Sequence, residues 1–412
     1  MNKRIIITGG ILFSMIVILL SQTVYAQKSG RIYGKIYTRD DETYEGRIRW
    51  DNHETAWEDI LDANHYIYSD YAYDNRSKVT IFGLKFRKER QKRRGRSTVE
   101  MGVKFGHLKS IERLSRKSAL LTYQSGRELE VFSTSTDIGE NVRGIIIEDI
   151  VVGTTKLYWD DLDWVEFKKE PGSYSREITR ENSDRICGKV ISWHNEEYEG
   201  AIMWDNDETL LCDILDGEDR GREYEIEFSK ISSIERDGRR AAIIKLSGDR
   251  TLRLSGTNDV NDDNRGIYIC GPDYGQVIIR WRDLDQAELL AAEQCTMRDY
   301  NDFDGGRKIY GEIVSDDGES YKGNIRWDDD EEYTCDLLDG SDNDIDYEIE
   351  FANIKIIRKR SSRSAFVQLK NGKKLRLSGS NDVNDENKGI FIIRDDEEVR
   401  IPWEDFKEAR FE

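Results

Sequence analysis

One short pattern occurs three times in the chain, and this repetition constrains the fold more than any other feature. Residues 46–54 read GRIRWDNHE, residues 200–208 read GAIMWDNDE, and residues 323–331 read GNIRWDDDE. Self-similarity at long spacing is typical of proteins in which successive structural units bury a shared core. We therefore expect three tandem repeats, because a pattern that occurs three times is more typical of architecture than of a single active site.

A second set of tryptophans fixes the length of each repeat. Trp159, Trp281 and Trp403 are equally spaced along the chain. The sequence therefore divides into repeat 1 over 27–170, repeat 2 over 183–292 and repeat 3 over 306–412. Repeat 1 is longer than the other two, so we place an insertion in it at about 64–100.

Strand patterns fill each repeat. Tyr198, Ile202 and Trp204 alternate with residues of the opposite face, and residues 321–327 alternate in the same way. A period of two indicates a half-buried strand, so we expect an all-β fold. Each repeat also contains, twice, an apolar-x-aromatic strand followed by a tight turn and a short apolar stretch, at 103–111 and 157–165 in repeat 1.

A half-unit with this order of strand, turn and strand resembles the small SH3-like and Sm-like barrels. The resemblance concerns architecture alone, and because such barrels bind very varied partners it implies no function. A half-unit is also small for independent stability. We therefore expect each repeat to consist of two packed SH3-like or Sm-like barrel halves.

The first 26 residues have the pattern of a signal peptide. A basic start at Lys3 and Arg4 precedes an apolar run over 5–20, and residues 24–26 (VYA) suit a cleavage site before Gln27. An uncleaved membrane anchor is the alternative, but the run is shorter than the ~20 residues of a spanning helix. We expect a bacterial protein exported to the periplasm or the medium, with no transmembrane segment after signal cleavage.

The charge of the chain restricts its partners. The formal net charge is -19, and it becomes -21 when the two basic residues of the signal peptide are removed. An acidic protein repels nucleic acid and anionic membrane and favours cations or basic partners, although solubility alone also explains such a charge. We expect a protein or glycan partner, whose identity the sequence does not give, and no nucleic acid.

Two groups of acidic residues are candidate cation sites. The first follows each repeated tryptophan and comprises Asp51, Glu54, Asp59 and Asp62, then Asp205, Glu208, Asp213 and Asp216, then Asp328, Glu331, Asp336 and Asp339. The second is an Asn/Asp-rich loop at 255–266 and again at 378–389, with candidate ligands Asp259, Asn261, Asp263, Asp382, Asn384 and Glu386. Ca²⁺ takes roughly six to eight oxygen ligands, although these loops lack the final bidentate Glu of an EF-hand. The alternatives are an acidic turn and a loop locked by Asx hydrogen bonds to its own backbone.

The insertion in repeat 1 carries a basic segment over 85–96. Its basic residues, the candidate partner-binding residues, are Lys85, Arg87, Lys88, Arg90, Lys92, Arg93, Arg94 and Arg96. In an acidic chain such a segment is suited to an anionic surface, or to an acidic face of this protein or of a second copy. The alternative is an exposed, solvated loop that proteases cut easily.

The five cysteines show no CxxC motif and no metal-ligand spacing. Most stand at strand positions that the other repeats fill with apolar or aromatic residues, which indicates small buried hydrophobic side chains. A disulfide between Cys187 and Cys270 is the alternative.

No catalytic constellation emerges. The four histidines share no repeated position, so no Ser-His-Asp site is visible. We predict an exported, non-enzymatic β-repeat protein for binding or scaffolding, with Ca²⁺ stabilising its Asp/Asn-rich loops and with Trp50, Trp204 and Trp327 in its core. One alternative is a carboxylate-based hydrolase of envelope or extracellular polysaccharide, which needs two carboxyl groups at a suitable separation. The other is an envelope-assembly protein that self-associates through the basic insertion.

Overall fold

The computed structural model describes residues 30–412 except 73–77, 82–83, 88–89, 133–135, 173, 175–183, 249, 292–293, 296 and 395–396. At 397, and at the described positions within 68–97, only the backbone is described. The predicted signal peptide over 1–26 lies outside these residues. The elements of the described part are mainly strands and short 3₁₀ turns, so the all-β prediction is confirmed.

Ten strands from the first part of the chain form one antiparallel sheet, which we call unit 1. In spatial order they are β11 (Gly153–Leu157), β10 (Ile145–Asp149), β2 (Thr43–Trp50), β1 (Tyr33–Thr38), β12 (Leu162–Phe167), β7 (Leu108–Arg113), β8 (Ser118–Tyr123), β9 (Glu128–Phe132), β3 (Ile60–Ala72) and β6 (Arg90–Lys104). The short strands β4 (Lys78–Ile81) and β5 (Leu84–Arg87) pair separately, inside the long hairpin of β3 and β6.

A second sheet contains twenty strands and comprises two further runs of ten. Unit 2 consists of β13 (Cys187–Ser192), β14 (Glu197–Met203), β15 (Ile214–Asp219), β16 (Arg222–Glu227), β17 (Ile231–Arg236), β18 (Ala241–Leu246), β19 (Thr251–Ser255), β20 (Ile267–Gly271), β21 (Gly275–Ile279) and β22 (Leu284–Leu289). Unit 3 consists of β23 (Tyr310–Ser315), β24 (Ser320–Trp327), β25 (Leu337–Asp342), β26 (Ile345–Glu350), β27 (Ile354–Ser361), β28 (Ser364–Leu369), β29 (Lys374–Ser378), β30 (Ile390–Arg394), β31 (Glu397–Ile401) and β32 (Phe406–Phe411).

The strands of each unit pair in the same spatial order. In unit 2 the pairings run β21-β20-β14-β13-β22-β17-β18-β19-β15-β16. In unit 3 they run β31-β30-β24-β23-β32-β27-β28-β29-β25-β26. Both orders match that of unit 1 strand for strand.

The sheets are open, so the predicted SH3-like or Sm-like barrel halves are not confirmed. In unit 1, β12 pairs with β1 on one side and with β7 on the other, which joins the two five-stranded halves of the unit into one continuous sheet. The halves are also not consecutive along the chain, because β2 pairs with β10 and the strands β3 to β9 lie between them in sequence.

Pairs of tryptophans occupy the core of each unit, as predicted for Trp50, Trp204 and Trp327. Each of these three side chains is fully buried. Their rings lie edge-to-face on those of Trp159, Trp281 and Trp403, with centroids 6.5, 6.4 and 6.4 Å apart. Such pairs add about 0.5–1.5 kcal/mol to the burial of large apolar surfaces.

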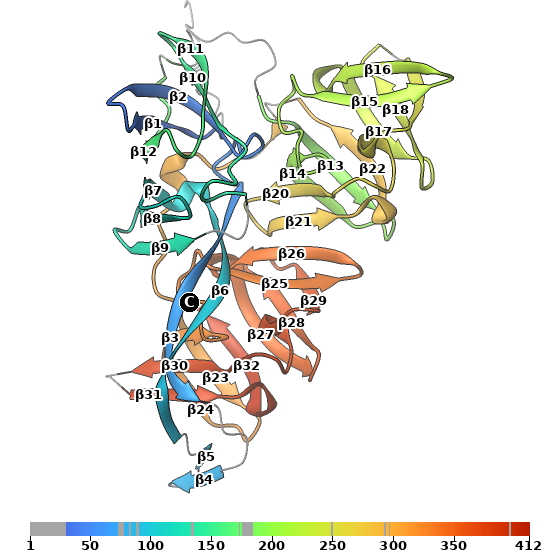
Figure 1. The fold of residues 1–412 in the computed structure, drawn as a ribbon. Helices are drawn as coiled ribbons and strands as arrows, with labels where there is room; N and C mark the ends of the chain where they lie inside the picture. The colour runs from blue at the N-terminus through green and yellow to red at the C-terminus, as the bar shows by residue number, and fades with distance from the viewer. Residues whose placement is uncertain are drawn as a thin grey trace, which may run out of the picture.

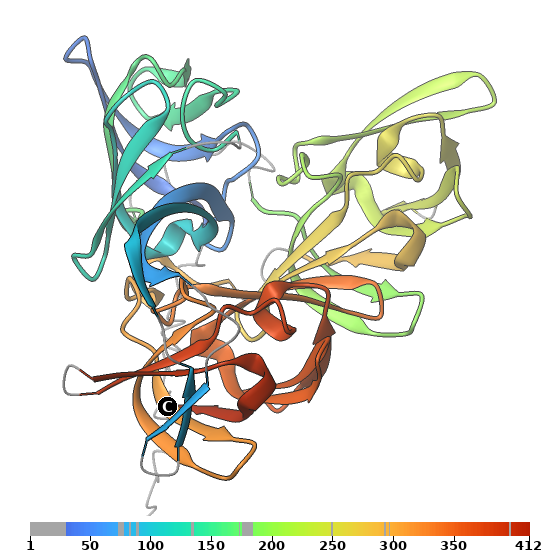
Figure 2. The ribbon, with the colours of Figure 1, turned by 60° about the horizontal axis from the view of Figure 1, so that its bottom comes forward.

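The three units contact one another around the centre of the molecule (Figure 1; Figure 2). Units 2 and 3 join through an antiparallel pairing of β21 with β26, in which Gln276, Val277 and Ile278 stand opposite Glu348, Tyr347 and Asp346. The side chain of Arg280 adds an ion pair of 2.9 Å to Asp346 across this junction. The second sheet is therefore continuous from one unit to the next.

Units 1 and 3 meet at a buried cluster of charged side chains. Lys104 Nζ lies 2.8 Å from Glu58 and 3.1 Å from Glu350, and all three side chains are at most 2% exposed. Arg298, from the segment between units 2 and 3, contacts both carboxylates at 2.7 Å. Burial alone raises the pKa of Glu58, but Lys104 and Arg298 outweigh it and lower the pKa to about 2. The cluster therefore holds charged groups in their charged form inside the molecule.

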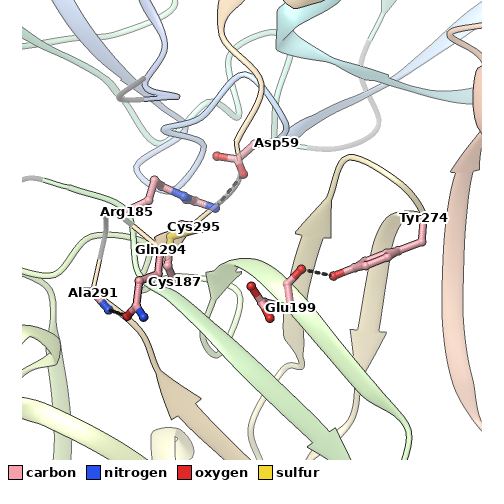
Figure 3. The surroundings of a disulfide bond; sticks show 8 residues. All are labelled: Asp59, Arg185, Cys187, Glu199, Tyr274, Ala291, Gln294 and Cys295. Carbon is pink, nitrogen blue, oxygen red and sulfur yellow. Dashed lines mark hydrogen bonds and ion pairs between the residues drawn. A yellow bond between two sulfur atoms is a disulfide. The ribbon is translucent and has the colours of Figure 1, made fainter. Parts of the chain in front are cut away.

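A disulfide joins the first strand of unit 2 to the segment after that unit. It links Cys187 with Cys295, whose Cα atoms lie 5.8 Å apart (Figure 3). The alternative of a Cys187–Cys270 bond is wrong, because both cysteines stand opposite Ala201, on the two strands that flank β14. Strands two apart in a sheet are roughly 9–10 Å from each other, which is too far for a disulfide. Cys270 is buried next to this bond, and Cys335 is buried elsewhere.

Candidate functional site

The repeated GxIxWD motif has a structural explanation in every unit. A Cβ at Gly200 would overlap the carbonyl oxygen of Cys270 on the neighbouring strand, so the strand requires glycine there. After Trp204 the chain reverses through Asp205 and Asn206, which have φ values of 52° and 56°. Asn and Asp tolerate this left-handed region better than most residues. The turn brings Glu208 back to Trp204, whose backbone N–H donates to the Glu208 carbonyl oxygen at 2.8 Å.

A distant loop completes a group of three carboxyl groups at this turn. The 3₁₀ turn η3 (Asn258–Val260) follows β19, and the carbonyl oxygen of Asp259 accepts a hydrogen bond of 2.9 Å from Trp204 Nε1. The Asp259 carboxylate accepts from the backbone N–H of Asp216 at 2.6 Å. Asp205, Glu208 and Asp259 each present a carboxylate oxygen, and these oxygens all lie within 4.8 Å of one another.

The same three positions are filled by carboxyl groups in every unit, and we call each set a carboxyl trio. The trios are Asp51, Glu54 and Asp137 in unit 1, Asp205, Glu208 and Asp259 in unit 2, and Asp328, Glu331 and Asp382 in unit 3. Trp50 Nε1 donates to the Asp137 carbonyl oxygen at 2.8 Å, and Trp327 Nε1 donates to that of Asp382 at 2.9 Å. The repeated tryptophan therefore holds the backbone of the third residue each time.

The first aspartate of each trio is neutralised by a basic residue of the same loop. Arg265 donates to Asp205 through its backbone N–H at 2.6 Å and through Nη2 at 2.9 Å. Arg143 pairs with Asp51 at 2.9 Å in unit 1. In unit 3 Lys388 Nζ lies 3.9 Å from the Asp328 carboxylate, which also accepts from the amide of Asn381 and from the backbone N–H of Lys388. These aspartates thus have partners for their charge.

The glutamate of each trio lacks such a partner on one oxygen. Among the described residues, Oε2 of Glu54, of Glu208 and of Glu331 is buried and has no hydrogen-bond partner. Burial, with Asp259 nearby, raises the pKa of Glu208 to about 9. Burial also raises the pKa of Glu54 and of Glu331 well above its usual value. Near neutral pH the raised pKa of Glu208 therefore favours a bound proton or another cation at the trio of unit 2.

The Asn/Asp-rich loops do not bring their predicted ligands together. Asp259 and Asp382 turn inward to the trios, as described above. Asn261 Oδ1 instead accepts from the backbone N–H of Asp263 at 2.7 Å, and Asn384 Oδ1 accepts from that of Glu386 at 2.7 Å. Asp263 and Glu386 are exposed. The Asx-turn alternative thus describes Asn261 and Asn384, and the oxygens that converge with that of Asp259 come from Asp205 and Glu208.

The acidic group after each tryptophan is also divided among different roles. Asp213 Oδ2 accepts from the backbone N–H groups of Thr209 and Leu210, at 2.8 and 2.9 Å, and Asp213 pairs with Arg49 of unit 1 at 2.9 Å. Asp59 and Asp336 cap the equivalent turns and face Arg185 and Arg127. These aspartates lock turns and connect units.

A cleft between units 1 and 3 offers a binding surface. Its volume is about 690 Å³, and β3, β6 and the segment 329–339 line it. Its carboxyl side chains are Asp62, Glu100, Glu128, Asp329, Asp330, Glu331, Glu332, Asp336, Asp339 and Glu348. Tyr66, Tyr123 and Tyr333 add aromatic rings. We call this hollow the acidic cleft.

Among the carboxyl groups of the acidic cleft, Glu332 pairs with Lys308 and Asp329 with Arg326, so the charge of the cleft is only partly compensated. Its guanidinium, that of Arg127, is stacked between the rings of Tyr123 and Tyr333 at 3.8 Å from each centroid. Burial, with carboxyl neighbours, raises the pKa of Asp62 to about 6, that of Asp339 to about 6 and that of Glu348 to about 8. Groups with such raised pKa values in a cleft mark candidate functional sites.

Part of this cleft could be predicted from the sequence. Asp62 and Asp339 belong to the acidic groups singled out there, whereas Glu348 belongs to a strand with no such signal. The predicted partner-binding residues of the segment 85–96 lie outside the described side chains, and among their positions only backbone strands are described. No helix of the described residues is long and apolar enough to cross a membrane.

Comparison with known proteins adds no relative. No family model, no curated protein and no solved structure matches the chain.

Proposed function

We propose that the protein is an exported, non-enzymatic binding or scaffolding protein, built from three repeats of one β unit. The common strand order of the three units and the recurrence of the carboxyl trios support the repeat organisation. The three-fold recurrence of these carboxyl groups favours structure over catalysis. The buried disulfide supports export, because such bonds persist mainly outside the cytosol.

One observation carries the binding role, namely the lining of the acidic cleft. Ten carboxyl side chains face the cleft, and its guanidinium already has partners in Tyr123, Tyr333 and Asp336. A cationic ligand would be attracted to this concentration of carboxyl groups, and the ring of Tyr66, which is 36% exposed, would stack on a guanidinium group or cover a methylene stem. The ligand that fits best is an extended, Arg- or Lys-rich segment of a protein partner.

Titration calorimetry with an Arg-rich peptide tests this role. We expect binding that weakens with salt, and no binding of a Glu-rich peptide of equal length. Asp339→Asn combined with Glu100→Gln should weaken binding about tenfold or more, because each change removes a carboxylate from the lining of the cleft. Glu235→Gln, at an exposed position of unit 2, is the matched control. If the protein bound a neutral oligosaccharide more tightly than the basic peptide, the partner would be a glycan and not a basic protein segment.

We also propose that a hard cation such as Ca²⁺ stabilises the protein at the carboxyl trios. The support is the convergence of three carboxylate oxygens in unit 2 together with the partnerless Oε2 atom of Glu208. Ca²⁺ and a proton would compete for this oxygen, so the rise in melting temperature with calcium should grow as the pH increases. Glu208→Gln should diminish that rise, whereas Asp263→Asn should preserve it. Equal melting temperatures in EDTA and in calcium at every pH would show that no cation stabilises the protein at the trios.

The unequal carboxyl groups of the acidic cleft favour one alternative, a carboxylate-based hydrolase of polysaccharide. Burial raises the pKa of Glu348 to about 8, so near neutral pH this side chain is mostly protonated, as a general acid must be. Burial raises the pKa of Asp62 to about 6, so this side chain is mostly ionised, as a base must be. Release of reducing sugar from envelope or extracellular polysaccharide, lost in Glu348→Gln, would establish it. The other alternative, self-association through the segment 85–96, predicts that trypsin cleavage near Arg93 abolishes assembly.

A further inference from the structure

The junction between units 2 and 3 shows how one unit receives another. The edge strand β21 of unit 2 lies antiparallel to the edge strand β26 of unit 3, with Val277 opposite Tyr347. Beyond the strands, the hairpin tip before β21 contacts unit 3 as well, because the carbonyl oxygen of Pro272 accepts from Asn353 Nδ2 at 3.0 Å. Gly275 permits close approach, since a Cβ there would overlap the carbonyl oxygen of Glu348.

Both edges of this junction have equivalents elsewhere in the chain. In unit 1 β11 pairs with β10, just as β21 pairs with β20 in unit 2. The two pairs have the same register, so Thr155 of β11 is the counterpart of Val277 of β21. Likewise β16 pairs with β15 as β26 pairs with β25, which makes Tyr224 the counterpart of Tyr347. In the described part of the chain, β11 pairs only with β10 and β16 only with β15.

These two edges lie apart and face away from the centre. Figure 1 shows β11 at the upper left of the molecule and β16 at the upper right, on different units. Gly153, Thr154 and Lys156 of β11 are exposed, as are Arg222, Glu223 and Glu225 of β16. Open edges of this kind are templates for pairing with another chain. Because they are separated within one molecule, they can meet only between two molecules.

The residues on the two edges are complementary in the register of the internal junction. That register places Thr154 opposite Glu225, Thr155 opposite Tyr224 and Lys156 opposite Glu223. An opposite-charge pair and a Thr–Tyr pair directly across two strands are both favourable. Gly153 also has open space beside it, so β11 allows the same close approach as Gly275 does in β21.

The hairpin tip before β11 exposes an apolar surface. Ile150, Val151 and Val152 are 44%, 90% and 61% exposed, and they are consecutive. The equivalent tip in unit 2 contacts unit 3, as described above. The equivalent edge strand of unit 3 is β31, and the sequence before it is Arg394-Asp-Asp. β31 begins at Glu397, where β11 has Gly153. Consecutive exposed aliphatic residues mark contact sites, and only the tip before β11 has them among these three.

We propose that the β11 edge of one molecule pairs antiparallel with the β16 edge of a second copy of the chain, in the register of the β21–β26 junction. Each molecule then offers its β11 edge to one neighbour and its β16 edge to another. The contact is head-to-tail, so it produces open chains or rings and not a closed dimer of two identical patches. This proposal is independent of the acidic cleft and of the carboxyl trios.

Cross-linking tests the register directly, in the full chain carrying Cys212→Ser to remove the exposed free thiol. A Thr155→Cys variant mixed with a Tyr224→Cys variant should give a disulfide-linked dimer under mild oxidation, because directly opposite residues come within disulfide range. Thr155→Cys mixed with Glu223→Cys is the matched control and should give little product, because residue 223 points to the other face. Equal cross-linking of the two mixtures, or of neither, would overturn the proposal.

Sedimentation of charge variants tests the same contact without new cysteines. Wild type should associate with increasing concentration, and Lys156→Glu should weaken this association about tenfold or more, because like charges would then face each other. Lys156→Glu combined with Glu223→Lys should restore it, while Lys407→Glu, at an exposed position of β32, should leave it unchanged. A monomeric wild type at every concentration, or loss of assembly on changing β31 alone, would also overturn the proposal.

Discussion

His107 Nε2 lies 2.7 Å from Glu350 Oε1 although 243 residues separate them in the sequence. Both side chains are buried, and Glu350 also meets Lys104 and Arg298. Burial alone raises the pKa of Glu350, but Lys104, His107 and Arg298 outweigh it and hold the pKa well below its usual value. Unit 3 is thus connected to unit 1 by a carboxylate whose charge is stable only while its partners are present.

Lys104→Ala should destabilise the protein by about 3–5 kcal/mol, because it leaves the carboxylates of Glu58 and Glu350 buried with less compensation. Denaturant unfolding measures this cost, and Lys109→Ala, at an exposed position, should change stability little. In wild type, the lowered pKa of Glu58 means that its contribution is complete above the unfolded value of 4.5 and is lost as the pH falls toward about 2. A Lys104→Ala protein as stable as wild type would show that water already screens the cluster.

The trio of unit 2 should make the free energy of unfolding fall as the pH rises. Burial raises the pKa of Glu208 from 4.5 to about 9, so the folded state keeps a proton that the unfolded chain releases between these values. Glu208→Gln imitates the protonated form and should flatten this part of the stability profile, measured in EDTA. Exposed Glu235→Gln should leave the profile as it is. A wild-type profile without this slope would mean that the Glu208 carboxylate is solvated or bound to a cation.

Trp204→Ala should cost about 3–5 kcal/mol, as expected when a large buried ring is removed. The ring is fully buried, stands edge-to-face with Trp281, and holds the Asp259 loop through its indole N–H. Thermal or denaturant unfolding gives the value. Trp193→Ala, in which a ring that is 63% exposed is removed, is the control. A stable Trp204→Ala protein that had lost a partner would instead make Trp204 a contact residue.

Reduction of the Cys187–Cys295 bond should lower the melting temperature. The bond closes a sequence separation of 108 residues, and in the chain-entropy account a loop of about 100 residues is worth about 4.7 kcal/mol. Cys295→Ser should reproduce the effect without reductant, and Cys212→Ser should not. In the native protein a thiol reagent should label Cys212, which is exposed, and should spare Cys270 and Cys335. Labelling of Cys187 without reductant would contradict the bond.

The sequence alone identified the strands, the buried tryptophans and the tight turns that follow them. These features depend on residues close together in the chain: alternation with a period of two places Ile202 and Trp204 on one face, and Asp205 and Asn206 accept the left-handed turn. It also pointed to Asp259 and to the acidic group after each tryptophan. Features that depend only on neighbouring residues can be predicted from the sequence.

Only the tertiary structure decided which of these segments become neighbours. It placed β10 next to β2, brought Asp259 to Glu208, paired Cys187 with Cys295 and not with Cys270, and formed the acidic cleft between two units. Pairings over such distances are selected by the burial and hydrogen bonding of the whole sheet, to which each residue contributes little. Short-range patterns therefore specify the strands of this protein, whereas its sites depend on which strands pair when the complete chain folds.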